Sequence, residues 1–232
     1  MKLTLVKKSD EAKGAESFYF TSDEEFKFEA GQYIYITLPK LNYPDERGDT
    51  RHFTISSSPT EGNIIRITTR IREESGYKKT LDELPIGTII EGRGPQGLFI
   101  LPKDKSPERS HFFLAGGIGI TPFRSMIKYN MDNNLNLNIH LIYSNSNSDF
   151  IFNDELTKWQ EESENLKIDF IDTSISGHID ATKLSSLLNN APFLNPNFWV
   201  VGPNAFVNAM EETLETMKIT EDSIKTEKFT GY

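Results

Sequence analysis

Residues 1–101 contain short runs in which hydrophobic and polar positions alternate, with turn residues between the runs. The alternation is clearest at residues 33–38 and 64–71, and a period of two is typical of strands with one buried face. We therefore predict a small β-barrel or sandwich in this half. Further strands are expected at residues 17–20, 51–56, 88–92 and 98–101, and residues 81–84 can form one helical turn.

The pattern changes after residues 102–110, a polar stretch with two prolines that we interpret as a linker. Beyond it, apolar strands alternate with helical segments, which is typical of a parallel sheet covered on both faces. We place the domain boundary so that residues 1–104 form the first domain and residues 105–232 the second. Strands are expected at residues 111–114, 138–143, 167–171, 198–201 and 224–229, and helices at 122–131, 154–162, 181–188 and 203–217.

Length and charge limit the classes of protein that fit. A chain of 232 residues is comfortable for two domains that each bury a core. The formal net charge of −9 argues against binding to nucleic acid, which needs clustered Lys and Arg. No apolar run approaches the roughly 18 residues of a membrane span. Residues 1–10 lack the apolar stretch of a secretory signal, so we expect a cytoplasmic protein.

The sequence has no cysteine, which excludes disulfides, thiolate zinc sites, a catalytic thiol and cysteine-ligated iron–sulfur clusters within these residues. Its four histidines lie far apart and show no metal-ligand spacing: His52, His111, His140 and His178. We therefore predict no metal site.

Several basic residues of the first half lie close together in the sequence. We interpret most of them as a solvated strand face, and basic residues of this half would also suit docking of an acidic partner. The residues are Arg66, Arg70, Arg72, Lys78 and Lys79.

An apolar strand in the second half runs into a glycine-rich turn and then a helix. The turn contains Gly116, Gly117 and Gly119, and Thr121 can cap a helix whose first position is Pro122. Glycines let a ligand approach the backbone, and a helix N-terminus attracts an anion such as a dinucleotide pyrophosphate. A tight turn that needs glycine only for its dihedral angles explains the pattern equally well. The spacing differs from the standard GxGxxG fingerprint.

The stretch RHFTISSSPTEG at residues 51–62 begins as a strand and ends in three consecutive serines. It fits a plain strand that runs into a turn. It also fits a strand whose Arg51, Phe53 and Thr54 face a bound ligand.

Five motifs come in an order that resembles the ferredoxin-NADP reductase family: RHFT, GYKKT, GPQGLF, AGGIGITP and VGP, at residues 51–54, 76–80, 94–99, 115–122 and 201–203. The resemblance covers nearly the whole chain. It implies an antiparallel Greek-key β-barrel that binds FAD, followed by an α/β domain with a parallel sheet that binds NADH or NADPH.

The resemblance also implies roles for the RHFT residues. Arg51 matches the family arginine that pairs with the flavin pyrophosphate, a task suited to a bidentate donor. Phe53 replaces the tyrosine that packs flat on the isoalloxazine ring, and Thr54 matches the hydroxyl that reaches flavin N5. The serines at 56–58 are interpreted as strand end and turn.

The segment GYKKT matches the family segment that holds the flavin phosphates, with Thr80 as hydroxyl donor. Tyr77 fits a position over the cofactor or an exposed turn aromatic. The implied flavin contacts are Arg51, His52, Phe53, Thr54, Gly76, Tyr77, Lys78, Lys79 and Thr80.

The chain departs from the family near the expected hydride path, where Val201 stands at the position of a common cysteine. Relatives place an aromatic residue near the chain end, for which Phe229 is our first choice and Tyr232 the second. Glu227 is a candidate to carry protons to N5, so the implied catalytic residues are Thr54, Glu227 and Phe229. The implied nucleotide contacts are Gly116, Gly117, Gly119, Thr121, Pro122, Tyr143, Ser144, Gly202, Pro203 and Phe229.

The segment after Tyr143 should face the adenosine ribose, and residues 144–149 contain no basic side chain. His178 stands where relatives often have arginine. Both features favour NADH over NADPH, because arginine usually meets the 2′-phosphate.

The resemblance implies a flavoprotein reductase that takes a hydride from NAD(P)H onto FAD and passes electrons singly to a separate acceptor. Such an acceptor would be a ferredoxin, a flavodoxin, a cytochrome or an oxygenase component. Two alternatives are a reductase of free flavin or ferric chelates, and a flavin-binding assembly subunit without hydride transfer.

Overall fold

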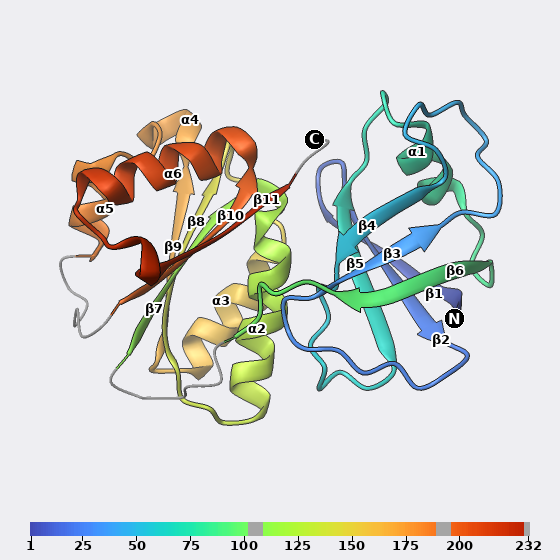
Figure 1. Ribbon diagram of the computed structural model, residues 1–232, viewed down its shortest axis with the longest axis horizontal. Helices are drawn as coiled ribbons and strands as arrows, with labels where there is room; N and C mark the ends of the chain where they lie inside the picture. The colour runs from blue at the N-terminus through green and yellow to red at the C-terminus, as the bar shows by residue number, and fades with distance from the viewer. Residues whose placement is uncertain (102–108, 189–195, 230–232) are drawn as a thin grey trace. The chain divides into compact units, whose positions relative to one another are not determined.

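The structure is a computed structural model that describes residues 1–101, 109–188 and 196–229 (Figure 1). The chain divides into two compact units, Met1–Leu101 with Arg124–Tyr129, and Pro102–Phe123 with Asn130–Tyr232. The predicted domain boundary between residues 104 and 105 lies outside the described residues.

The first unit is an antiparallel sheet of six strands in the order β4-β3-β6-β1-β2-β5. The end strands β4 and β5 approach each other through a bridge between Ile55 and Ile67, which gives the sheet the barrel-like closure that the resemblance implied. The strands are β1 (Lys2–Ala12), β2 (Ala15–Ser22), β3 (Tyr33–Thr37), β4 (Thr50–Thr54), β5 (Ile64–Arg70) and β6 (Ile89–Gln96).

Alternation along these strands fills the barrel as predicted. Ile34 and Ile36 of β3 and Ile65 and Ile67 of β5 are buried in one hydrophobic cluster. Arg66 is an exception, because it is buried and not part of a solvated face. Its guanidinium donates to the hydroxyl of Ser17 at 2.9 Å and pairs with Glu11 at 2.6 Å, so Arg66 is not available for docking.

One predicted strand of the first unit is wrong, and one predicted helical turn is part of a longer helix. Residues 98–101 form no strand, because Gly97 has a φ of +109° after β6 ends and turns the chain, leaving Leu98 exposed. The helical turn predicted at 81–84 is the end of a longer helix, α1 (Gly76–Glu83), whose N-cap is Ser75. The segment GYKKT is therefore helical, because the Ser75 side chain accepts from the third following amide.

The second unit is a parallel sheet of five strands in the order β11-β10-β7-β8-β9, with all five strands as predicted. Its strands are β7 (Ser110–Gly116), β8 (Asn138–Asn145), β9 (Leu166–Asp172), β10 (Asn197–Pro203) and β11 (Ile224–Phe229). Its helices are α2 (Ile120–Asp132), α3 (Asn153–Glu162), α4 (Thr173–Ser176), α5 (Ala181–Leu188) and α6 (Asn204–Thr216), with short 3₁₀ turns at Gly117–Gly119 and Glu221–Ser223.

Helices cover both faces of this sheet, as Figure 1 shows. Phe112 and Leu114 of β7 pack in a cluster with α5 and α6. Phe113, which points to the opposite face, stacks on Phe123 of α2 with ring centroids 4.4 Å apart. The near-continuous apolar run of β7 follows from burial on both faces.

Within the first unit, the carboxyl groups of Glu16 of β2 and Asp82 of α1 lie close enough to affect each other's protonation. Burial, the hydrogen bond to Asp82 and the negative charges of Asp82 and Asp10 raise the pKa of Glu16 from 4.5 to about 7, against the opposing charge of Lys8. The folded chain therefore holds a proton that the unfolded chain releases near pH 4.3. Since the folded state binds more protons, this group lowers stability as pH rises from about 4.3 to 7.

We predict that replacing Glu16 with Gln raises the unfolding temperature at pH 8 and reduces the difference in unfolding temperature between pH 5 and pH 8. Glutamine cannot ionise and still offers a hydrogen bond to Asp82. Thermal unfolding followed by circular dichroism checks this, with the exposed Glu91→Gln on β6 as control. An E16Q protein that melts lower than the wild type at pH 8 would contradict it.

Candidate functional site

Arg51 of β4 is held at the edge of the barrel by a network of backbone oxygens. Its Nη1 donates to the carbonyls of Arg47 at 2.7 Å, Gly48 at 3.0 Å and Thr50 at 2.8 Å. Its Nη2 pairs with the carboxylate of Asp45. The guanidinium is thus fixed in position and aimed at an anion.

The same carboxylate lies at the N-terminus of α1. The backbone amide of Tyr77 donates to Asp45 Oδ2 at 2.9 Å, and the hydroxyl of Ser75 donates to the same oxygen at 3.1 Å. Burial alone would raise the pKa of Asp45, but hydrogen bonds from the amides of Tyr77 and Arg47, the Ser75 hydroxyl and the charge of Arg51 hold it below its usual range. We call the Arg51 guanidinium, the Ser75 hydroxyl and the Tyr77 amide the anion cradle.

Further positive charge surrounds this cradle. Lys78 is buried, and burial together with the charges of Arg72, Arg47 and Arg51 lowers its pKa to about 8. Like charges gathered in this way favour the approach of an anion. The sequence prediction missed Asp45 and Ser75, although a serine directly before a helical segment is a recognisable capping signal.

The other predicted residues of GYKKT lie in different surroundings. Tyr77 is fully buried and donates its hydroxyl to the carbonyl of Ile36 at 2.9 Å. The interpretation of Tyr77 as an exposed turn aromatic is therefore wrong. Thr80 donates to the carbonyl of Gly76 at 2.7 Å and accepts from another backbone amide, which satisfies its hydroxyl within the chain. The hydroxyl that faces the cradle is Ser75. Lys79 pairs with Glu73 at 3.1 Å.

Gly76 has a steric role at this helix start. A Cβ atom at this position would overlap the carbonyl oxygens of Pro44 and Tyr43, so only glycine allows the loop before β4 to lie against the helix. The glycine thus brings Asp45 to the N-terminus of α1.

The RHFT strand turns its residues to two faces. Arg51 and Phe53 lie on the inner face, where the Phe53 ring is 6.0 Å from that of Tyr77. His52 is exposed on the outer face, with its ring 5.3 Å from Tyr33 and 5.7 Å from Tyr35. The exposed ring of the motif is therefore His52, and a flavin platform at Phe53 stays a prediction.

Thr54 is a buried residue at the end of β4 and lies opposite Tyr33. The serines that follow satisfy the backbone of the turn. Ser56 donates its hydroxyl to the carbonyl of Arg66 at 3.1 Å, and Ser57 donates to Ile64 at 2.9 Å. The interpretation of these serines as strand end and turn is confirmed.

The glycine turn of the second unit is explained largely by its close packing against β10 and α6. A Cβ at Gly119 would overlap the carbonyl oxygen of Val201, and a Cβ at Gly116 or Gly202 would overlap the ring of Phe206. Gly117 instead has a φ of +52°, which favours glycine.

Thr121 does not cap α2. Its hydroxyl donates to the carbonyl of Ile118 at 3.1 Å, because the helix begins at Ile120, directly after the 3₁₀ turn, and Pro122 lies inside its first turn. Packing and backbone angles therefore account for the glycines of this turn without a bound ligand.

The carboxyl ends of the parallel strands form one edge of the sheet, where open α/β sheets bind ligands. Tyr143 near this end of β8 is buried, with its ring 5.1 Å from Phe150. Ser144 is also buried, and Asn145 donates to the carbonyls of Asn147 and Asp149, both at 3.1 Å. Asn145 therefore fixes the loop at this edge.

Glu227 of β11 lies opposite Val201 of β10, at the same edge. Burial raises its pKa to about 7, and its Oε2 is buried without a hydrogen-bond partner among the described residues. Phe229 lies opposite Pro203. Tyr232 lies outside the described residues.

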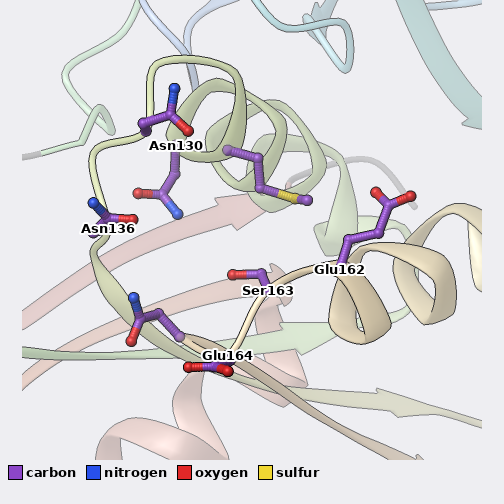
Figure 2. A pocket seen from close by; sticks show the side chains of 8 residues that line it. Asn130, Asn136, Glu162, Ser163 and Glu164 are labelled. Atoms are coloured by element: carbon purple, nitrogen blue, oxygen red, sulfur yellow. The ribbon is translucent and has the colours of Figure 1, made fainter.

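A pocket of about 290 Å³ in the second unit lies elsewhere (Figure 2). Asn136 and Asn165, which line it, lie just before β8 and β9 in the chain, so the pocket lies at the amino ends of these strands. It is therefore not the nucleotide site expected at the carboxyl edge. The remaining lining residues are Asn130, Met131, Asn134, Glu162, Ser163 and Glu164.

Residues 1–101, 109–188 and 196–229 contain no group of three His, Cys, Asp or Glu side chains placed to hold a metal ion. Within the same ranges, no helix has the length and apolar character needed to cross a membrane.

Comparison with known proteins identifies both halves of the chain. Residues 2–100 match the oxidoreductase FAD-binding domain, and residues 113–212 match the oxidoreductase NAD-binding domain.

Flavohemoprotein A of Dictyostelium discoideum is 24% identical over 96% of this chain and 58% of its own length. The glycine betaine monooxygenase reductase subunit of Pseudomonas aeruginosa is 29% identical over 90% of this chain and 59% of its own length. This chain thus spans somewhat over half the length of these relatives.

The solved structure of ferredoxin-NADP+ reductase from Plasmodium falciparum has the same fold. It superposes with a TM-score of 0.79 and 22% identity over 98% of this chain and 95% of that one.

We predict that Gly119→Ala destabilises the second unit by about 3 kcal/mol when no nucleotide is present. The new methyl group would collide with the backbone of Val201, which cannot move aside. Gly177→Ala, where a Cβ meets open space and only the positive φ is unfavourable, should cost about 1 kcal/mol. Urea unfolding followed by tryptophan fluorescence measures both, since the two tryptophans, Trp159 and Trp199, belong to this unit. A G119A protein as stable as the wild type would refute the packing explanation.

Proposed function

Because this chain belongs to the ferredoxin-NADP reductase family of FAD- and NAD-binding oxidoreductases, we propose that it takes a hydride from NADH onto FAD and delivers electrons singly to a separate acceptor protein. The bound flavin supplies the chemistry of accepting two electrons together and releasing them one at a time. The protein supplies binding, orientation and protons.

The observation that carries this proposal is the anion cradle at the N-terminus of α1. Arg51, the Ser75 hydroxyl and the Tyr77 amide already hold a carboxylate, so they are oriented for oxygens with negative charge. Arg47 and Lys78 add positive charge, which suits the two charges of a diphosphate. The residues present therefore fit the phosphates of FAD.

Three further residues of this chain have proposed roles in the reaction. Thr54, at the end of the strand that carries Arg51, offers a hydroxyl for flavin N5. Glu227 supplies the proton that must accompany a hydride in full reduction of the flavin. Its pKa of about 7 lets it hold this proton at neutral pH and release it without a large cost. Phe229 is proposed as the aromatic residue beside the nicotinamide position.

The proposed preference for NADH rests on the loop after β8. Residues 144–149 contain no Lys or Arg to meet a 2′-phosphate, and the loop ends in the acidic Asp149. An acidic side chain near the adenosine ribose disfavours the extra phosphate by charge repulsion. The contacts of Asn145 hold this loop in place.

The proposed acceptor is a separate electron-transfer protein or oxygenase component. This is supported by the relative named as a monooxygenase reductase subunit, and by the absence of cysteine from these 232 residues, which leaves no ligands for a cysteine-bound cluster. Comparison of turnover with a ferredoxin, a flavodoxin and free flavin distinguishes this acceptor class from a flavin reductase.

We predict that the purified protein binds flavin and that its flavin absorbance bleaches on anaerobic addition of NADH, with slower bleaching by NADPH. Arg51→Ala should raise the dissociation constant for FAD about 10- to 100-fold, the scale of a lost charge-assisted hydrogen bond. Arg93→Ala, an exposed arginine over the Tyr35 ring of the same unit, is the control. Absorbance titration measures both, and a protein that takes up no flavin would disprove the proposal.

We predict that the rate of flavin reduction by NADH falls as pH rises through about 7, because deprotonated Glu227 has no proton to give. Glu227→Gln should lower the rate at pH 6 by about 10-fold or more and flatten the profile. Stopped-flow absorbance between pH 5.5 and 8.5 measures this. The control is Glu211→Gln, which removes a half-exposed carboxylate paired with Lys228. An unchanged pH profile in E227Q would rule out the proton role.

A further inference from the structure

The anion cradle is occupied by a carboxylate of the protein itself. Asp45 uses both of its carboxylate oxygens there: Oδ1 pairs with Arg51 and accepts from the amide of Arg47 at 3.0 Å, and Oδ2 accepts from Ser75 and Tyr77. Its side chain is only 8% exposed. This carboxylate therefore takes every donor of the cradle.

The loop that carries Asp45, residues 38–49 between β3 and β4, is fastened along α1. The amide of Asn42 donates to Thr80 Oγ1 at 3.0 Å, and its side-chain amide donates to Glu83 at 3.0 Å. The hydroxyl of Tyr43 donates to Glu83 at 2.5 Å. These contacts bring Asp45 to the start of the helix without holding its carboxylate in the cradle.

A carboxylate and a phosphate cannot share these donors. Both are acceptors only, both carry negative charge, and at about 4 Å two like charges repel strongly at a poorly hydrated site. A phosphate group that takes the Arg51, Ser75 and Tyr77 donors must first displace the Asp45 side chain.

We propose that Asp45 is an internal competitor for the phosphate groups of flavin nucleotides and sets how tightly this protein holds them. The inference rests on the proposed function, since it requires the phosphates to bind in the anion cradle. The inference predicts the direction of the effect of Asp45 on flavin affinity. Asp45 weakens binding of FAD and FMN, which carry phosphate, and leaves binding of riboflavin, which carries none, unchanged. A flavin held against such competition exchanges more readily with free flavin.

If Asp45 instead orients Arg51 for the ligand, the predicted change in flavin affinity has the opposite sign. If Asp45 only orients Arg51 for the ligand, its removal leaves the guanidinium misplaced and weakens binding of phosphate-bearing flavins. The sign of the change therefore distinguishes competition from orientation.

The test is a titration of flavin-free protein with FAD, FMN and riboflavin, followed by flavin fluorescence. In Asp45→Asn, which keeps the shape of the side chain and removes its charge, the dissociation constants for FAD and FMN should fall at least about tenfold, while that for riboflavin changes less than twofold. Asp49→Asn removes the same charge from the same loop outside the cradle and should leave all three constants near the wild-type values.

Equal or weaker binding of FAD by D45N would overturn the inference, and so would an equal gain for riboflavin. If neither wild type nor variant binds any flavin, the proposed function fails as well. If the protein binds flavin and D45N leaves FAD binding unchanged or weakens it, this inference alone is wrong.

A measurement on the wild-type protein covers the case in which D45N does not fold. Adding FAD should speed hydrogen exchange at the amide of Arg47, which loses its bond to Asp45, while the amide of Tyr77 stays protected by phosphate. Residue-resolved exchange by nuclear magnetic resonance measures both amides. Slower exchange at Arg47 on FAD binding would show that Asp45 stays in place and would overturn the inference.

Discussion

The buried pair of Arg51 and Asp45 at the start of α1 is the interaction on which the first unit's site depends. A buried ion pair persists only where further hydrogen bonds satisfy both partners, and here the backbone supplies them. Carbonyls before β4 satisfy the guanidinium, and the amides of Arg47 and Tyr77 satisfy the carboxylate. The barrel edge, the loop and the helix are thus fixed together around one charge pair.

A different constraint shapes the second unit, where backbone must pass close to backbone. Gly119 approaches the carbonyl of Val201, and Gly116 and Gly202 leave room for the ring of Phe206. The parallel pairing of β7 and β10 brings their ends together at the carboxyl edge of the sheet. Glu227 on the neighbouring strand reaches this edge as well, and its burial brings its pKa close to neutral pH. The close backbone packing and this titratable carboxyl group therefore lie at one edge of the sheet.

The two units use charge in opposite ways. The first gathers Arg47, Arg51 and Lys78 about one helix terminus, which suits the phosphates of a flavin nucleotide. The second offers no basic side chain in residues 144–149, which is the basis of the proposed preference for NADH. A net charge of −9 for the whole chain conceals this local division. Such local fields, more than total charge, decide which ligands approach a site.

The sequence alone determined the two-part fold and the alternation of strands and helices in the second half, because periodicity and ordered motifs are local properties of the chain. It did not determine that Arg66 is buried, that GYKKT is helical, or that Phe53 faces inward while His52 is exposed. Only the tertiary structure brought Asp45 from a loop to the cradle of Arg51 and Ser75. That contact joins separate segments, and no periodicity along the chain encodes the close approach of a carboxylate to a helix terminus 30 residues away.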